Sequence, residues 1–140
     1  MNIQINSSNN RIAVVVFFIL GLLPGLVNAD CADAPGPGVN WAGCDKQGVD
    51  LSGLDLTSAV FTRANLENAD FSGSRLSHAD LNLSNLNNAN FAGARMLGAR
   101  LIGVKAQGAN FSGAILDDAS LSRSRLNTAD FSGARPVSYT

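Results

Sequence analysis

Large apolar side chains recur every five residues over most of this chain. From Leu51 to Phe131 every fifth residue is large and apolar, with Ala106 as the single exception, and the residue two before it is most often alanine or serine. An α-helix repeats every 3.6 residues and a strand every two, so neither explains a period of five. A solenoid does, when each five-residue unit forms one side of a square coil.

A longer period of 20 residues is superimposed on the period of five. The stretch Ala69–Gly73 reads Ala-Asp-Phe-Ser-Gly, and close variants of it begin at Ala89, Ala109 and Ala129. Four units therefore complete one coil, and residues 20 apart should stack on successive coils of one wall. The residues predicted to form the core of these stacks are Phe71, Phe91, Phe111, Phe131, Leu76, Leu81, Leu86 and Leu101.

The unit follows the pattern A(D/N)Lxx from Val49 to Arg135 without a gap, and in this the chain resembles the pentapeptide-repeat family. The resemblance implies that residues 49–135 form an all-β, right-handed quadrilateral β-helix, a solenoid of about four coils. At roughly 4.8 Å per coil, this rod would be about 20 Å long. We expect the central residue and the small residue two before it to point inward. The small central residue Ala106 should then be compensated by Val104, which fills the small position of the same unit.

Glycine occupies the second position after the central residue along one whole wall, at residues 53, 73, 93, 113 and 133. A type II turn requires a positive φ angle there, which glycine adopts without steric cost. We therefore predict type II turns along this edge. The sequence leaves the turn types of the other corners open, since they carry residues such as Asn68, His78, Asn88, Asp118 and Arg123.

Residues 1–29 have the features of a secretory signal peptide. The segment Ile12–Leu23 is apolar apart from one glycine, a Pro-Gly pair follows it, and short residues precede a predicted cleavage after Ala29. The alternatives are an uncleaved membrane anchor and a lipoprotein signal ending at Cys31. The anchor would have only the 16 residues from 12 to 27, against the roughly 20 that a span needs. Asp30 stands where a lipoprotein signal has a small residue.

Residues 30–48 are predicted to form a short N-terminal cap. An even number of cysteines in an exported chain favours a disulfide, here between Cys31 and Cys44. A metal site at this pair would need further ligands, and the lone histidine His78 is far along the chain. The single tryptophan, Trp41, should cover the first coil, and stacking on a carbohydrate is the alternative role for it.

The C-terminal tail, residues 136–140, is too short to cover the end of the rod. Pro136 falls at the next central position and has no N–H to donate to a further coil. An uncovered edge is a template for pairing with another chain. We therefore expect that two copies of the protein could pair end to end, burying Phe131 and Tyr139.

Charge and composition exclude several classes of function. The formal net charge is -1, and it becomes -2 after cleavage because Arg11 leaves with the signal peptide. This composition does not indicate a nucleic-acid-binding protein. The sequence predicts no catalytic residues, no cofactor site and no metal site. His78 and the acidic pair Asp117-Asp118 are interpreted as solvated corner residues.

Polar side chains also recur at outward positions of the coil. Two interpretations remain open for them: amides that satisfy one another across coils, and a flat face that a partner recognises. The outward residues are Asp50, Asp70, Asn90, Asn110 and Asp130 on one wall, Arg75, Arg95, Ile115 and Arg135 on the next, and Glu67, Asn87, Gln107 and Asn127 on the last.

Together these features predict a non-enzymatic structural or interaction module in the periplasm or outside the cell, free of the membrane after cleavage, with an unidentified protein partner. The alternative comes from the family resemblance. Some members mimic duplex DNA and protect type II topoisomerases, a role that requires a cytoplasmic, longer and strongly acidic rod. An ice-binding face is disfavoured because Thr57, Thr62 and Thr128 form no column.

Overall fold

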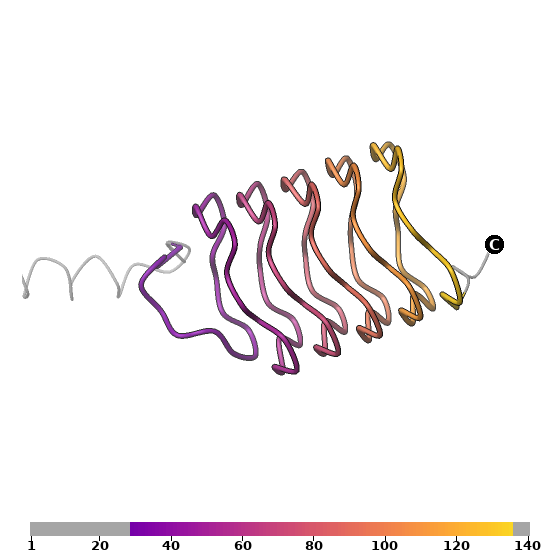
Figure 1. Ribbon diagram of the computed structural model, residues 1–140. Helices are drawn as coiled ribbons and strands as arrows, with labels where there is room; N and C mark the ends of the chain where they lie inside the picture. Colours follow the sequence, from indigo (N-terminus) through magenta and orange to yellow (C-terminus); the bar gives the residue numbers. More distant parts are fainter. Residues whose placement is uncertain (1–28, 136–140) are drawn as a thin grey trace, which may run out of the picture.

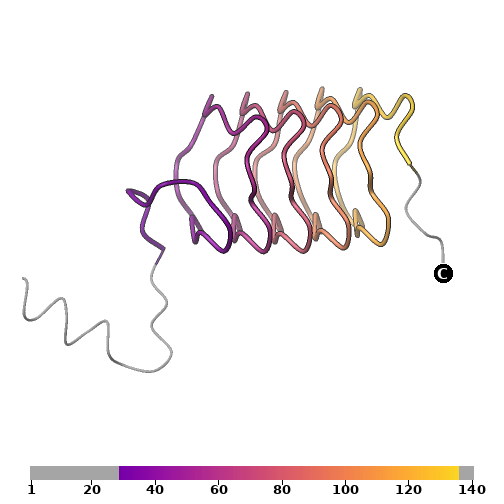
Figure 2. The same ribbon diagram turned by 90° about the horizontal axis from the view of Figure 1, so that it is seen from below.

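Parallel bridges between residues 20 apart build the fold. The computed structural model describes residues 29–135, and in this range it contains no helix and no strand longer than a single bridged residue. Sixteen bridges run without interruption from Asn40–Val60 to Ile115–Arg135. The chain therefore advances one coil every 20 residues and forms the β-helix that its periodicity predicts (Figure 1, Figure 2).

Backbone hydrogen bonds run along the rod between successive coils. Phe71 N–H donates to the carbonyl of Asn90 on the next coil at 2.7 Å, and Asn90 N–H donates back to the carbonyl of Ala69 at 2.9 Å. This pair of bonds recurs at the other bridges along the rod, so each coil satisfies the backbone of the coil before it. We number the walls by one central residue each: wall one contains Phe91, wall two Met96, wall three Leu101 and wall four Ala106.

The predicted type II turns are present along the glycine edge of wall one. Gly93 has a φ of 66°, and the N–H of Ala94 closes the turn by donating to the carbonyl of Phe91 at 3.0 Å. The other three edges have the same turn even where no glycine stands. The positive-φ residues other than glycine are Ser58, Arg63, Asn68, His78, Leu83, Asn88, Asp118, Arg123 and Thr128. Asparagine, aspartate and histidine tolerate this conformation, whereas at Leu83 and Arg63 the closure of the coil overrides the local preference.

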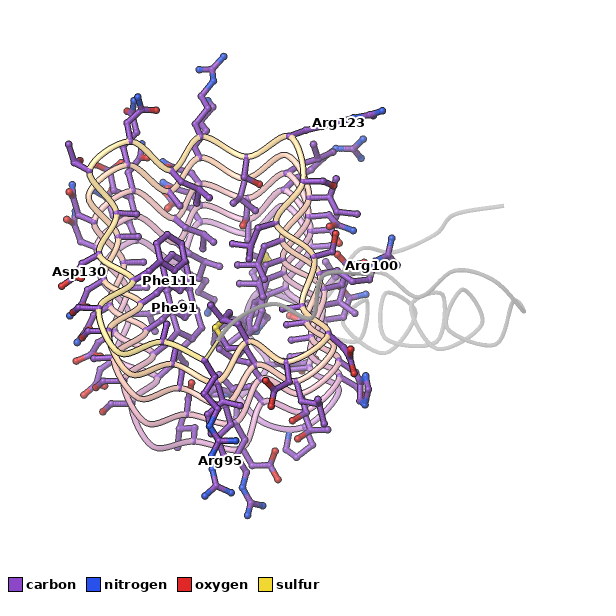
Figure 3. All side chains as sticks on the ribbon, turned by 90° about the vertical axis from the view of Figure 1, so that its right-hand side faces the viewer. Phe91, Arg95, Arg100, Phe111, Arg123 and Asp130 are labelled. Carbon is purple, nitrogen blue, oxygen red and sulfur yellow. A yellow bond between two sulfur atoms is a disulfide. The ribbon has the colours of Figure 1, made fainter. Side chains whose placement is uncertain are left out.

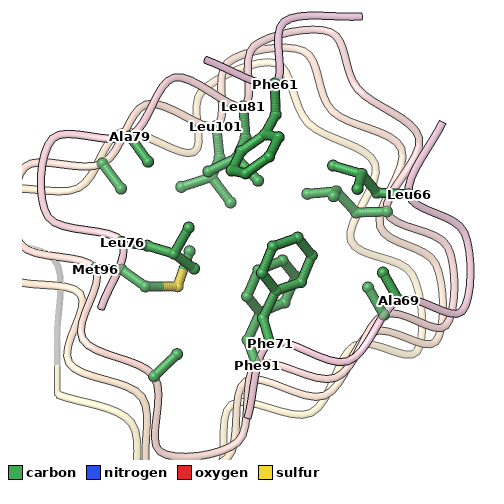
Figure 4. Close-up of a cluster of buried hydrophobic side chains, with 14 of the residues drawn as sticks. Phe61, Leu66, Ala69, Phe71, Leu76, Ala79, Leu81, Phe91, Met96 and Leu101 are labelled. Carbon is green, nitrogen blue, oxygen red and sulfur yellow. The ribbon is translucent and has the colours of Figure 1, made fainter. Parts of the chain in front are cut away.

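The interior is filled by one large and one small side chain from each wall (Figure 4). Phe91 lies between Phe71 and Phe111, with ring centroids 4.7 and 4.9 Å away and ring planes within 5° of parallel. Val104 and Ala106 are both fully buried, as expected if the unit exchanges volume between its two inward positions. A single continuous core thus runs the length of the rod.

The coils begin about ten residues before the repeat pattern does. Asn40 and Asp45 already bridge to Val60 and Asn65, so walls three and four each have one level more than the repeat pattern indicates. Trp41 takes the central position below Phe61, with its ring centroid 5.9 Å from that ring. Residues 39–48 of the predicted cap are therefore the start of the first coil.

A disulfide joins the segment before the first coil to the coil itself. Cys31 bonds to Cys44, and their Cα atoms are 5.6 Å apart. Cys44 is buried at the small position below Ala64, and Lys46 places its Nζ 3.9 Å from the centre of the Trp41 ring. The disulfide and this cation–π contact thus both hold the N-terminal end of the core.

Two predicted segments lie outside the described residues: the signal peptide of residues 1–29, except for Ala29, and the tail 136–140 with Pro136 and Tyr139. Within residues 29–135, no helix has the length and hydrophobicity needed to cross a membrane. The last described coil is less covered than the others, since Leu121, Leu126 and Phe131 are only partly buried.

Candidate functional site

The outer faces of the rod are the parts of the molecule that a partner can reach. Each wall presents two columns of side chains, one from the residue before the central position and one from the residue after it. Figure 3 shows these side chains pointing away from the coil, with Asp130 on wall one, Arg95 on wall two and Arg100 on wall three. We therefore describe each wall by its columns.

Wall one presents carboxylates and amides that are tied to the rod itself. Asn90 Nδ2 donates to Asp70 Oδ1 at 3.2 Å, and Asn110 Nδ2 donates to Asn90 Oδ1 at 3.2 Å. The same oxygens accept the backbone N–H two residues on, as Asp70 Oδ1 does from Ser72 at 2.9 Å. On this wall the structure supports the first interpretation of the polar columns, in which side chains satisfy one another across coils.

These local turns also lower the pKa of three exposed aspartates. The Ser52 hydroxyl and then its N–H stabilise the ionised carboxylate of Asp50, and Thr57 acts in the same way on Asp55. For Asp130 the N–H of Ser132 is the main cause of the lowered pKa. Carboxylates with a lowered pKa stabilise the fold above their unfolded pKa, and this contribution is lost as the pH falls through the folded pKa. The lowered pKa values of these aspartates thus come from hydrogen bonds within the turns of the rod.

Wall two combines positive charge with exposed apolar surface. Arg75 and Arg95 are bridged on consecutive coils, and neither forms an ion pair among residues 29–135. Leu97 follows Arg95 by two residues and is 42% exposed, and Ile115 continues the arginine column on the next coil. At the end of the column, Arg135 lies 3.9 Å from Asp117.

Wall three carries an internal ion pair and an exposed leucine at its corner. Arg100 Nη1 lies 3.6 Å from Asp80 Oδ2 on the preceding coil. Leu83 is 52% exposed and leans over Gly103, where a Cβ would lie 2.8 Å from its Cδ2. The charges in the column before the central residues of this wall are therefore paired with each other within the chain.

The charge of the side chains on wall four changes sign from one end of the rod to the other. Its column before the central residue reads Asp45, Asn65, Asn85, Lys105 and Arg125 from the first coil to the fifth. Asn65 Nδ2 donates to Asp45 Oδ1 at 2.9 Å, and Asn85 Nδ2 donates to Asn65 Oδ1 at 3.1 Å. The column thus runs from an acid through amides to two bases.

This change on wall four is part of a charge asymmetry along the whole rod. Residues 30–90 contain eight acidic and three basic side chains, a balance of -5. Residues 91–135 contain three acidic and six basic side chains, a balance of +3. The net charge of -2 over residues 30–135 conceals this axial separation.

The structure also places the remaining residues that the sequence singled out. His78 is exposed at a corner, and a Cβ on Gly98 would come within 2.7 Å of its Nδ1, so the imidazole packs across the next turn. Trp41 is only 1% exposed, which excludes the carbohydrate-stacking role for its ring. In residues 29–135, no three His, Cys, Asp or Glu side chains are grouped to hold a metal ion.

Sequence comparison gives one family match. The model for pentapeptide repeats matches eight copies, over residues 42–77, 69–105 and 96–133. No curated protein sequence matches this chain.

Solved structures of pentapeptide-repeat proteins also match. HetL of Nostoc sp. strain PCC 7120, involved in heterocyst differentiation regulation, is 30% identical with a TM-score of 0.48; the match covers 70% of this chain and 51% of HetL. This chain thus matches only about half the length of HetL. The plasmid-mediated fluoroquinolone resistance protein QnrB1 is 24% identical over 70% of this chain and 58% of its own, with a TM-score of 0.36. A protein of the Arabidopsis thaliana thylakoid lumen is 27% identical over 57% and 66%, with a TM-score of 0.23.

Proposed function

Because this chain belongs to the pentapeptide-repeat family, we propose that it is an exported, non-enzymatic module that binds another protein through the outside of its rod. The disulfide between Cys31 and Cys44 supports export, since such bonds persist in oxidising compartments outside the cytoplasm. Periplasmic or secreted localisation also follows from the signal-peptide pattern of residues 1–29.

The filled interior supports a binding role over catalysis. Small-molecule and catalytic sites usually occupy concave pockets. Here the space between the walls is taken up by the stacked core side chains, and in residues 29–135 every buried side-chain nitrogen or oxygen has a hydrogen-bond partner. The pKa shifts belong to exposed aspartates in turns, whereas catalytic groups are typically perturbed in clefts.

Wall two is the face that we propose for the partner, and one observation carries this choice. Arg75 and Arg95 stack directly on consecutive coils next to the exposed Leu97, and neither forms an ion pair in residues 29–135, although Asp55 precedes Arg75 in the same column. Like charges placed directly opposite each other destabilise a sheet, so a partner with an acidic surface would relieve this cost. Arginine beside apolar side chains is also the composition of protein interfaces.

Two further routes have less support. Protection of a topoisomerase by DNA mimicry, the alternative role, would require an acidic rod, whereas walls two and four carry basic side chains. End-to-end pairing of two copies would use the incompletely covered last coil. Phe131 in that coil already stacks on Phe111, with ring centroids 4.8 Å apart, so pairing would cover only its other face.

Charge reversal on wall two should abolish binding of a periplasmic partner. We expect the double variant Arg75→Glu/Arg95→Glu to lose a protein that the wild-type rod retains on affinity capture from periplasmic extract. The double variant Asn90→Glu/Asn110→Glu is the matched control, because it adds two carboxylates to equivalent positions of wall one. Loss of the same protein from both variants, or from neither, would contradict wall two as the binding face.

A further inference from the structure

The outward column of wall four is complementary to its own reversed copy. Four consecutive bridges join Asp45, Asn65, Asn85, Lys105 and Arg125 in this order. When the column is turned end over end about Asn85, Asp45 lies opposite Arg125 and Asn65 lies opposite Lys105. We propose that wall four is a self-association face, on which a second copy of this chain docks antiparallel.

The geometry of this dimer follows from the column. A two-fold axis lies in the interface, perpendicular to both rods, at the level of Asn85. It brings Asp45 opposite the partner's Arg125, Asn65 opposite the partner's Lys105, and Asn85 opposite the partner's Asn85. Because a two-fold interface uses the same patch on both copies, each ion pair forms twice.

A second acid strengthens the match. Glu67 follows Asn65 by two residues, and its Oε2 accepts a hydrogen bond from Asn85 Nδ2 at 3.3 Å. This contact holds the Glu67 carboxylate beside the column, at the level that faces the partner's Lys105. Each copy would therefore offer two acids to the two bases of the other.

Within residues 29–135, the two bases of wall four form no ion pair. Lys105 and Arg125 are exposed and bridged to each other on consecutive coils. Two like charges so placed repel each other. The partner's Asp45 and Glu67 would remove this repulsion, which gives the face a reason to be paired.

The other three walls fail the same test. Reversal of wall one places Asp50 opposite the partner's Asp130, and reversal of wall two places Arg95 against its own copy on the axis. Reversal of wall three places Asp80 against its own copy, and Asp80 is already paired with Arg100. Reversal of wall two also places Asp55 opposite the partner's Arg135, but among the four described columns only that of wall four reverses without placing like charges opposite each other.

The size of the face predicts a weak, salt-sensitive dimer. Five levels at about 4.8 Å give a contact only about 19 Å long, and small polar interfaces belong to transient complexes. Wall two lies on the opposite side of the rod from wall four, so each copy keeps it open. The dimer would then present two such faces pointing in opposite directions.

Sedimentation equilibrium of the oxidised, exported protein tests the charge pairing. We expect a dimer at about 0.03 M salt and a monomer at about 0.5 M, where exposed charges are screened. Asp45→Arg and Arg125→Asp should each weaken the dimer about tenfold, since each converts two attractive pairs into repulsive ones. The double variant Asp45→Arg/Arg125→Asp should restore it. A monomer in low salt, or a dimer that neither single variant weakens, would overturn the proposal and, in the second case, point to the C-terminal edge.

A cross-link tests the geometry separately. In Asn85→Cys the introduced thiol would lie on the two-fold axis, facing its own copy, so oxidation should yield a covalent dimer in low salt only. Asn90→Cys is the matched control, because Asn90 occupies the same column position and level on wall one. Equal cross-linking of the two variants, or none from Asn85→Cys, would overturn the antiparallel arrangement.

Discussion

Replacing Phe91 by alanine should lower the free energy of unfolding by about 3–5 kcal/mol. Phe91 is fully buried at the middle level of wall one, stacked between Phe71 and Phe111. The substitution removes two ring contacts at once and leaves a cavity that the hydrogen-bonded coils on either side cannot readily close. In a solenoid, stability depends on contacts between neighbouring repeats, so a weak level in the middle separates the rod into two halves.

Urea denaturation of Phe91→Ala and Leu116→Ala measures this effect. Leu116 is also buried, but it lies one level from the C-terminal end, where the core is already partly exposed. We expect a smaller loss for Leu116→Ala, near the lower end of the roughly 2–5 kcal/mol that buried leucines cost. Equal losses from the two variants would contradict the stacking of wall one as the main source of stability.

Removing the disulfide should cost about 3 kcal/mol, the second largest effect that we expect. Cys31 and Cys44 are 13 residues apart, and a loop of that size restricts the unfolded chain by about this amount. The double variant Cys31→Ala/Cys44→Ala isolates the effect, because alanine is the residue that most small inward positions of the coil carry. Cavity formation at residue 44 should therefore add little.

Tryptophan fluorescence during urea denaturation reports on the same variant. Trp41 is the only tryptophan, and its ring forms the N-terminal end of the core. Without the disulfide, the first coil should open at a lower urea concentration than the rest of the rod, and the emission should shift to the red. The wild-type protein with its disulfide reduced is the control and should behave in the same way. An unchanged midpoint would show that the bond does not stabilise the first coil.

The register of the rod could be predicted from the sequence because the inward positions have so little chemical freedom. A wall accepts one large and one small side chain per coil, so Phe71, Phe91 and Phe111 recur at the spacing of the coil itself. The same argument predicted the exchange of volume between Val104 and Ala106. In such a fold, the spacing of the core residues along the sequence directly predicts which residues stack on successive coils.

The first coil was missed because its central positions do not look like the others. Trp41 and Cys44 stand 20 residues before Phe61 and Ala64, and this spacing was the signal that could have revealed the coil. Lys46 obscured it, since a lysine at a central position appears to end the repeat. The structure resolves the conflict by placing its ammonium group over the Trp41 ring.

The backbone geometry of the corners and the role of the polar columns could not be predicted from the sequence alone. Leu83 and Arg63 have positive φ angles that neither residue favours, because the closed coil imposes them. Whether an outward asparagine amide is hydrogen-bonded within the rod depends on the side chain one coil away, as Asn90 depends on Asp70. The sequence contains the residues of wall four, but the change from acidic to basic side chains along this wall becomes visible only when the coils are stacked.

The central claim is that this rod is exported and works by binding outside the cytoplasm. The intact mass of the protein recovered from the envelope or medium of its native host tests this claim most directly. We predict a chain that begins at Asp30, with Cys31 and Cys44 bonded to each other. A full-length, cytoplasmic protein with both thiols free would contradict the export on which the proposed function rests.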